Sequence, residues 1–121
     1  MKISYETRTI VDYSFKLGYL ISVTISDLRE IITLIKKTDF LNALNLMEKD
    51  FLIRFDLLEK YFYKLFKHEG INENEFNDVK KFCEDSHLLI KDIINEIKNT
   101  KSLTKQKIEL IEKLLKDLLD N

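Results

Sequence analysis

The sequence predicts an all-α fold, an antiparallel up-down bundle of four helices with a long first helical hairpin, in one domain spanning residues 1–121. The 121 residues include no proline and only two glycines, Gly18 and Gly70. Sheet proteins of this length need turn-forming residues at regular spacing, whereas long helices joined by short loops need almost none. Four segments also carry apolar residues at the period of an amphipathic helix. Short polar connectors between these segments predict antiparallel neighbours.

The first apolar stripe predicts one long helix from about residue 7 to about residue 37. The β-branched run from Ile21 to Ile25 also fits a strand, but the stripe keeps its phase on both sides of it. We therefore expect helix throughout. The stripe consists of Ile10, Tyr13, Leu17, Leu20, Ile21, Leu28, Ile31, Ile32 and Ile35.

A second helix is predicted from about Phe40 to Lys67, after a break at Lys37 to Asp39 in which Asp39 is a possible N-cap. A second apolar row widens its apolar face, so we expect it to be the central element, and Gly70 is a natural C-cap. The main stripe is Phe40, Leu44, Met47, Phe51, Phe55, Leu58, Phe62 and Leu65, and the second row is Leu46, Ile53, Leu57 and Tyr61.

Two further helices complete the bundle. Asn72 followed by Glu75 resembles a capping box before a helix over residues 73–97. Its stripe is Phe76, Val79, Cys83, His87, Ile90, Ile94 and Ile97. After a connector at residues 99–102, the last helix carries Ile108, Ile111, Leu115 and Leu118 and ends at Asp120. Because this helix is about half as long as the first, part of the long pair is expected to project beyond the four-helix core.

The charge balance argues against nucleic acid and membrane as partners. Net charge is −1, and only three of the 20 basic residues are arginines. Duplex-binding proteins usually carry a positive excess and use arginine for bidentate contacts. The N-terminus lacks the apolar core of a signal peptide, and the longest uncharged run, from Leu17 to Ser26, is about half of a membrane span. A cytoplasmic location is therefore expected.

Glu84 and His87 have the Glu-x-x-His spacing used in di-iron bundles, but such sites need two of these motifs. The chain has two histidines in all, so we expect a histidine at the edge of the core, no metal and no cofactor. Cys83, one turn before His87, is interpreted as a buried core thiol because it lies within the apolar stripe. With no catalytic residues and no glycine-rich phosphate loop, the sequence predicts no enzyme.

A second apolar row on the first helix is the strongest candidate for a partner-binding surface. Val11, Phe15, Tyr19 and Val23 are four residues apart and lie off the main stripe. The small residues Ser14, Gly18, Ser22 and Ser26 run beside them, and small residues at this spacing let another helix approach closely. The row predicts contact with a partner helix or with a second copy of the chain, and core filling is the alternative.

Asp50 and Arg54 are one helical turn apart within the apolar face of the second helix. One interpretation is an ordinary ion pair between positions i and i+4. The other is a polar anchor inside an interaction groove, because arginine is enriched at interfaces. Both residues are therefore candidate partner-binding residues.

The region from Ile31 to Leu65 joins a long helix that ends in Lys36-Lys37-Thr38-Asp39-Phe40 to a leucine-rich second helix. The second helix contains Ala43-Leu44, Met47-Glu48, Leu52 and Leu57-Leu58. This layout resembles the flagellar type III export chaperones of the FliT and FlgN kind, and Glu96 to Leu118 fits their closing helices. The resemblance implies a helical protein that holds a helical end of a partner, with Arg54 or Lys49 as its central basic residue.

These observations favour a non-enzymatic module that sequesters a helical segment of another protein, through a helix-in-groove contact, or a homodimer. The alternative is a small helical subunit, or a phage or viral inhibitor, that acts in a nucleic-acid-associated defence complex. The two classes differ in the expected salt dependence of binding, which is steep for nucleic acid.

Overall fold

The computed structural model describes residues 5–69 and 72–120, and within them it contains helices and no strand. The predicted all-α bundle is confirmed, including the helical state of Ile21 to Ile25. None of the described helices is both long and apolar enough to cross a membrane. The elements are α1 (Tyr5–Lys36), α2 (Phe40–Leu46), the π-helical turn η1 (Met47–Phe51), α3 (Leu52–Glu69), α4 (Glu73–Thr100) and α5 (Lys105–Asp120).

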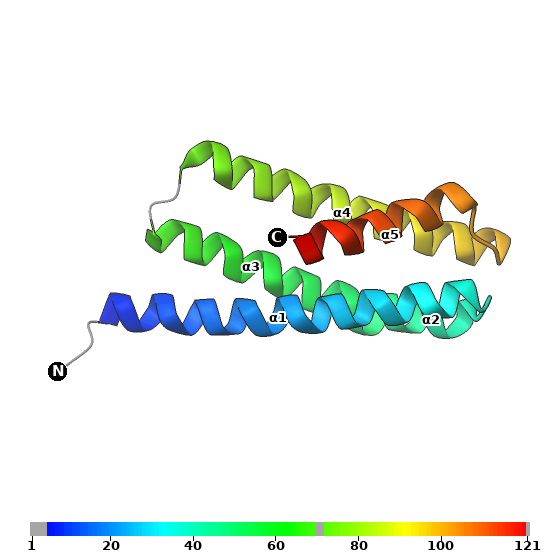
Figure 1. Cartoon of the computed structure of the whole chain (residues 1–121), viewed down its shortest axis with the longest axis horizontal. Helices are drawn as coiled ribbons and strands as arrows, with labels where there is room; N and C mark the ends of the chain where they lie inside the picture. The colour runs from blue at the N-terminus through cyan, green and yellow to red at the C-terminus, as the bar shows by residue number, and fades with distance from the viewer. Residues whose placement is uncertain (1–4, 70–71, 121) are drawn as a thin grey trace.

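The long helices run in alternating directions along one axis (Figure 1). α1 packs most extensively against α3 and, on its other side, against α5, and α4 contacts both α3 and α5. α5 stops near the middle of the bundle, so α1, α3 and α4 continue beyond its C-terminal end (Figure 1). The molecule is therefore a four-helix bundle at one end and a three-helix assembly at the other.

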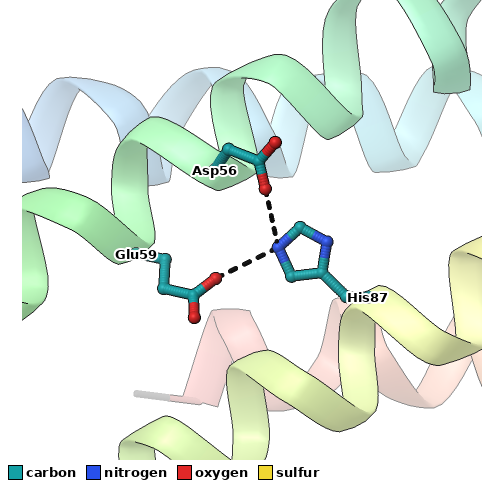
Figure 2. Close-up of side chains that lie close together, drawn as sticks. All are labelled: Asp56, Glu59 and His87. Atoms are coloured by element: carbon teal, nitrogen blue, oxygen red, sulfur yellow. Dashed lines mark ion pairs between the residues drawn. The ribbon is translucent and has the colours of Figure 1, made fainter.

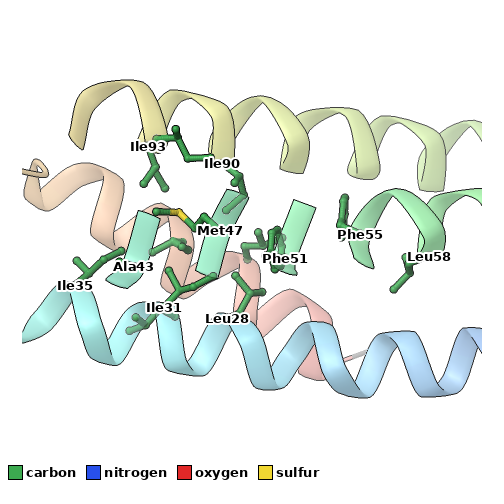
Figure 3. Packing of buried hydrophobic residues seen from close by; sticks show 14 of the residues in the cluster. Leu28, Ile31, Ile35, Ala43, Met47, Phe51, Phe55, Leu58, Ile90 and Ile93 are labelled. Atoms are coloured by element: carbon green, nitrogen blue, oxygen red, sulfur yellow. The ribbon is translucent and has the colours of Figure 1, made fainter. Parts of the chain in front are cut away.

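The second predicted helix is interrupted by the π-helical turn η1, which the sequence analysis did not foresee. Ala43, Met47, Phe51 and Phe55 are all fully buried although they are spaced four residues apart. In a regular α-helix each four-residue step advances the side chain by about 40°, so this line would drift away from the core. The wider π turn absorbs that drift. Figure 3 shows the four side chains pointing at α1 and α4.

The ends of the first loop differ from the sequence prediction. Asp39 lies at the N-cap position of α2, but its side chain makes no capping hydrogen bond. Its Oδ2 instead accepts a hydrogen bond from the Asn42 side-chain amide at 2.8 Å. Thr38 turns the chain with a left-handed φ of 58°. The loop is thus held by backbone conformation and a side-chain pair, and Asp39 occupies the predicted N-cap position without a capping hydrogen bond from its side chain.

The predicted cap of α4 is partly confirmed. The Asn72 side chain accepts a hydrogen bond from the Asn74 backbone N–H at 2.7 Å. In the described part of the chain Glu75 makes no return bond, so only half of the capping box forms. α4 continues to Thr100 and closes on Lys101, whose φ is 57°. The predicted C-cap at Gly70 lies outside the described residues.

Among the described residues, Thr24 is a core residue whose polar group has no hydrogen-bond partner. It lies on α1 and is fully buried, and the atom without a partner is Oγ1. A buried hydroxyl without a partner loses its hydration and gains nothing in return. The valine side chain has nearly the same shape and needs no partner.

We predict that Thr24→Val raises the free energy of unfolding by about 1 kcal/mol. Thr33→Val is the matched control, because the exposed Thr33 hydroxyl donates to the Arg29 carbonyl oxygen at 2.9 Å. That control is expected to leave stability nearly unchanged. Urea unfolding of the two variants measures both effects, and a loss of stability in Thr24→Val would contradict the prediction.

Candidate functional site

The outer face of α1 carries large apolar side chains that the bundle does not cover. Phe15 is 77% exposed, Tyr19 is 68% exposed and Val11 is 48% exposed. They lie on the side of α1 opposite its buried residues, such as Leu17 and Leu20. The alternative that this row fills the core is therefore wrong for these three residues. Val23, the fourth predicted member, is only partly exposed and packs against the core.

Gly18 lies between the exposed aromatic residues, and no other part of the chain occupies the space above it. A Cβ atom added there would meet no atom within 4 Å. Glycine inside a helix costs about 1 kcal/mol relative to alanine, and this chain gains no close contact from it. Ser14 and Ser22, one turn away on either side, are also exposed. The outer face thus has a row of small residues beside protruding aromatic side chains.

Arg54 does not pair with Asp50 as one interpretation expected. Its Nη1 instead reaches across to α1 and donates to both carboxylate oxygens of Asp27, each at 2.9 Å. Asp27 is buried, whereas Arg54 is partly exposed. Sequence reasoning missed Asp27 because a charged residue on the apolar side of a helix gives no signal until its partner on another helix is known.

The pair is electrostatically asymmetric. Burial raises the pKa of Asp27 above its usual 3.8, and the Arg54 hydrogen bond only partly opposes this effect. Asp27 raises the pKa of Arg54, and the nearby Asp50 and Tyr19 add to that increase. Arg54 is thus a cation held at the α1–α3 seam, close enough to Tyr19 to border the exposed apolar row.

The second apolar row of the second predicted helix is divided by the structure. Leu46 and Tyr61 pack against the core, and the Tyr61 ring contacts the Tyr13 ring at a centroid distance of 5.7 Å. Ile53 and Leu57 are exposed on α3. The second predicted helix contacts both α1 and α4, as expected of a central element, but Ile53 and Leu57 take no part in these contacts within the described chain.

Cys83 is buried, which confirms its interpretation as a core thiol. Burial, assisted by the charge of Glu59, raises its pKa to about 12, so the thiolate is scarce near neutral pH. The thiol borders an apolar recess of about 330 Å³ near the C-terminal end of α5, between Phe62 on α3 and Phe82 on α4. This recess marks the place where the fourth helix ends.

His87 is the centre of a polar cluster between α3 and α4 (Figure 2). Its Nε2 lies 3.0 Å from Asp56 Oδ1 and 3.1 Å from Glu59 Oε2. The histidine was expected at the edge of the core, and it is largely buried there. The sequence singled out Glu84 as its possible companion, but the closest carboxylates come from the other helix. Asp56 and Glu59 carry no recognisable signal because their partner lies about 30 residues further along the chain.

A scan against protein-family models finds no match to this chain, and searches of curated proteins and of solved structures find none either. The likeness to flagellar export chaperones therefore stays a prediction from the sequence. What the molecule does must be inferred from the geometry of its own surfaces.

We predict that Arg54→Met lowers the free energy of unfolding by about 1–3 kcal/mol at neutral pH, because it leaves the Asp27 carboxylate buried without a partner. The loss should shrink in acid. Burial raises the pKa of Asp27 in the folded state, so protonation of this carboxyl group in acid removes the cost of burying its charge. Without Arg54 that pKa rises further, so the variant regains stability in acid. Denaturant unfolding at neutral and acid pH measures the difference.

The matched control is Lys16→Met, which removes the exposed partner of Asp12 on the same helix, 3.0 Å away. An exposed pair of this kind contributes little, so stability should be nearly unchanged. A loss in Arg54→Met that is equal at both pH values would contradict the assigned cause.

Proposed function

We propose that this chain is a non-enzymatic protein-binding module that holds an amphipathic helix of a partner protein along the outer face of α1. The observation that carries the proposal is the exposure of Phe15 and Tyr19 beside Gly18, above which the chain leaves open space. Large aromatic side chains dominate the energetics of interfaces when a partner covers them. Each contributes about 1.5–3 kcal/mol when it is fully buried.

A helix is the occupant that fits this face best. The apolar side chains at positions 11, 15 and 19 are one turn apart, so they form a ridge that packs between the side chains of a second helix. The small residues at positions 14, 18 and 22 form the parallel groove. Arg54 borders the surface near Tyr19 and offers a fixed cation to an acidic side chain of the partner.

The more specific form of the proposal is an export chaperone or adaptor that keeps a helical end of its client from assembling prematurely. It is supported by the resemblance to flagellar export chaperones between Ile31 and Leu65, and by the exposed helical face that such an activity needs. In this form the client helix covers the face until it is handed on.

We predict that Phe15→Asp abolishes capture of the partner protein from a lysate of the source cells while leaving the melting temperature nearly unchanged, because the side chain is exposed. Leu41→Asp is the matched control, since Leu41 is 72% exposed on α2 and receives the same charge. The control should retain the partner. Equal loss in both variants, or equal retention, would contradict the proposal.

Gly18→Leu provides a second test that adds bulk and no charge. A Cβ atom at position 18 meets no described atom within 4 Å, so the fold should persist, while the strip of small residues needed by a partner helix is filled. Loss of partner binding is therefore expected. Light scattering of the purified protein separates the occupants: a dimer that Phe15→Asp converts to a monomer would show that a second copy of this chain, not a foreign helix, covers the face.

A further inference from the structure

We propose that Asp56, Glu59 and His87 form a binding site for a divalent transition-metal ion of the zinc type, which joins α3 to α4. The site lies outside the outer face of α1 and is independent of the proposed protein-binding function. One possible ligand atom of each residue lies within 4.8 Å of the other two. An imidazole nitrogen with two carboxylate oxygens is a ligand set that zinc accepts in proteins.

The contacts of His87 Nε2 differ from those of an ordinary hydrogen-bonded histidine. The atom is shielded from solvent and has no hydrogen-bond partner, although two carboxylate oxygens lie 3.0 and 3.1 Å away. The oxygens therefore lie off the axis along which this nitrogen donates or ligates. Figure 2 shows both carboxylates approaching the same nitrogen from α3. Ligands take up such positions around an ion held on that axis.

Two of the three separations between ligand atoms are close to those that zinc requires, and the third, between the two carboxylate oxygens, is at most 4.8 Å. With bonds of about 2.0–2.1 Å and tetrahedral angles, neighbouring ligand atoms lie roughly 3.3–3.5 Å apart. The present separations of 3.0 and 3.1 Å need to widen by only a few tenths of an ångström. Asp56 is 67% exposed, so its side chain is free to make this adjustment.

Two neighbours hold the ligands in place. The Tyr63 hydroxyl donates to Glu59 Oε1 at 2.6 Å, which leaves Oε2 directed at the histidine. The His87 ring packs edge-on against the buried Phe55 ring, with centroids 4.9 Å apart. Supporting contacts of this kind orient ligands in established metal sites.

The surroundings favour a cation and leave a coordination position open. The cluster opens into a shallow hollow of about 460 Å³ that is also bordered by Glu84 and Lys91. Three carboxyl groups and one ammonium group surround the histidine, so acidic groups outnumber basic side chains here, which favours a cation. A water molecule from the hollow can complete the coordination.

A metal ion here would act as a structural clamp. α3 packs mainly on α1, and its contact with α4 is much smaller. α5 packs on α4 at this level, where Leu114 and Asp117 lie beside Ser86, so the cluster lies within the bundle near the C-terminal end of α5. A bond between Glu59 and His87 through an ion would fix their separation.

The test is calorimetric titration of the purified full chain with ZnCl₂, together with melting curves at increasing zinc concentration. We expect one equivalent of zinc to bind and the melting temperature to rise with its concentration. Asp56→Asn, Glu59→Gln and His87→Gln should each weaken binding about tenfold or more, and Tyr63→Phe about 10–100-fold. MgCl₂ should bind far more weakly, because magnesium prefers oxygen ligands alone.

Two control variants separate this site from adventitious binding. His68→Gln removes the other histidine of the chain. Asp85→Asn removes the charge of Asp85, which follows Glu84 in the sequence but borders a different surface. Both should bind zinc as the wild type does. The proposal is overturned if the wild type binds no stoichiometric zinc, which would leave an ion-paired histidine only. It is equally overturned if Glu59→Gln and His87→Gln bind zinc with unchanged affinity.

Discussion

The architecture depends on one constraint, which is that Ala43, Met47, Phe51 and Phe55 must all face the core although they are spaced four residues apart. The π-helical turn meets this constraint, and it also sets the rotational phase of α3, which follows it. That phase directs Arg54 toward Asp27 on α1 and directs Asp56 and Glu59 toward His87 on α4. The packing of these four apolar residues therefore determines both polar contacts of α3, which are the Arg54–Asp27 pair and the cluster around His87.

The outer face of α1 is a second consequence of the packing. α1 contacts α3 on one side and α5 on the other, and these contacts bury the stripe that includes Leu28 and Ile31. Nothing in the described chain reaches the opposite side, where Phe15 and Tyr19 protrude. An exposed aromatic pair costs solubility unless a partner covers it, so the same packing that completes the core defines a surface suited to binding.

The polar groups between the helices differ in what they contribute. Asp27 is buried far enough that its pKa rises even with Arg54 beside it, so the pair holds α1 and α3 in register more than it stabilises them. His87, by contrast, is approached by two carboxylates of α3, which contacts α4 less extensively than it contacts α1. The Arg54–Asp27 ion pair is complete with its two residues. The nitrogen of His87, flanked by two carboxylate oxygens, offers a place for a cation.

The sequence by itself determined the fold class and the positions of the long helices, and it singled out the row that includes Val11, Phe15 and Tyr19, because a 3.6-residue period separates the two faces of a helix without reference to the rest of the chain. Whether that row is exposed or fills the core was decided by the tertiary structure. The sequence also indicated the core thiol at Cys83. The π-helical turn at Met47–Phe51 and the placement of Val23 against the core were decided by the tertiary structure, since both depend on which neighbours a face meets. The pairing of Arg54 with Asp27 and the gathering of carboxylates at His87 were decided there too, because charges distant in the chain become partners only when helix packing sets their separation and excludes water between them.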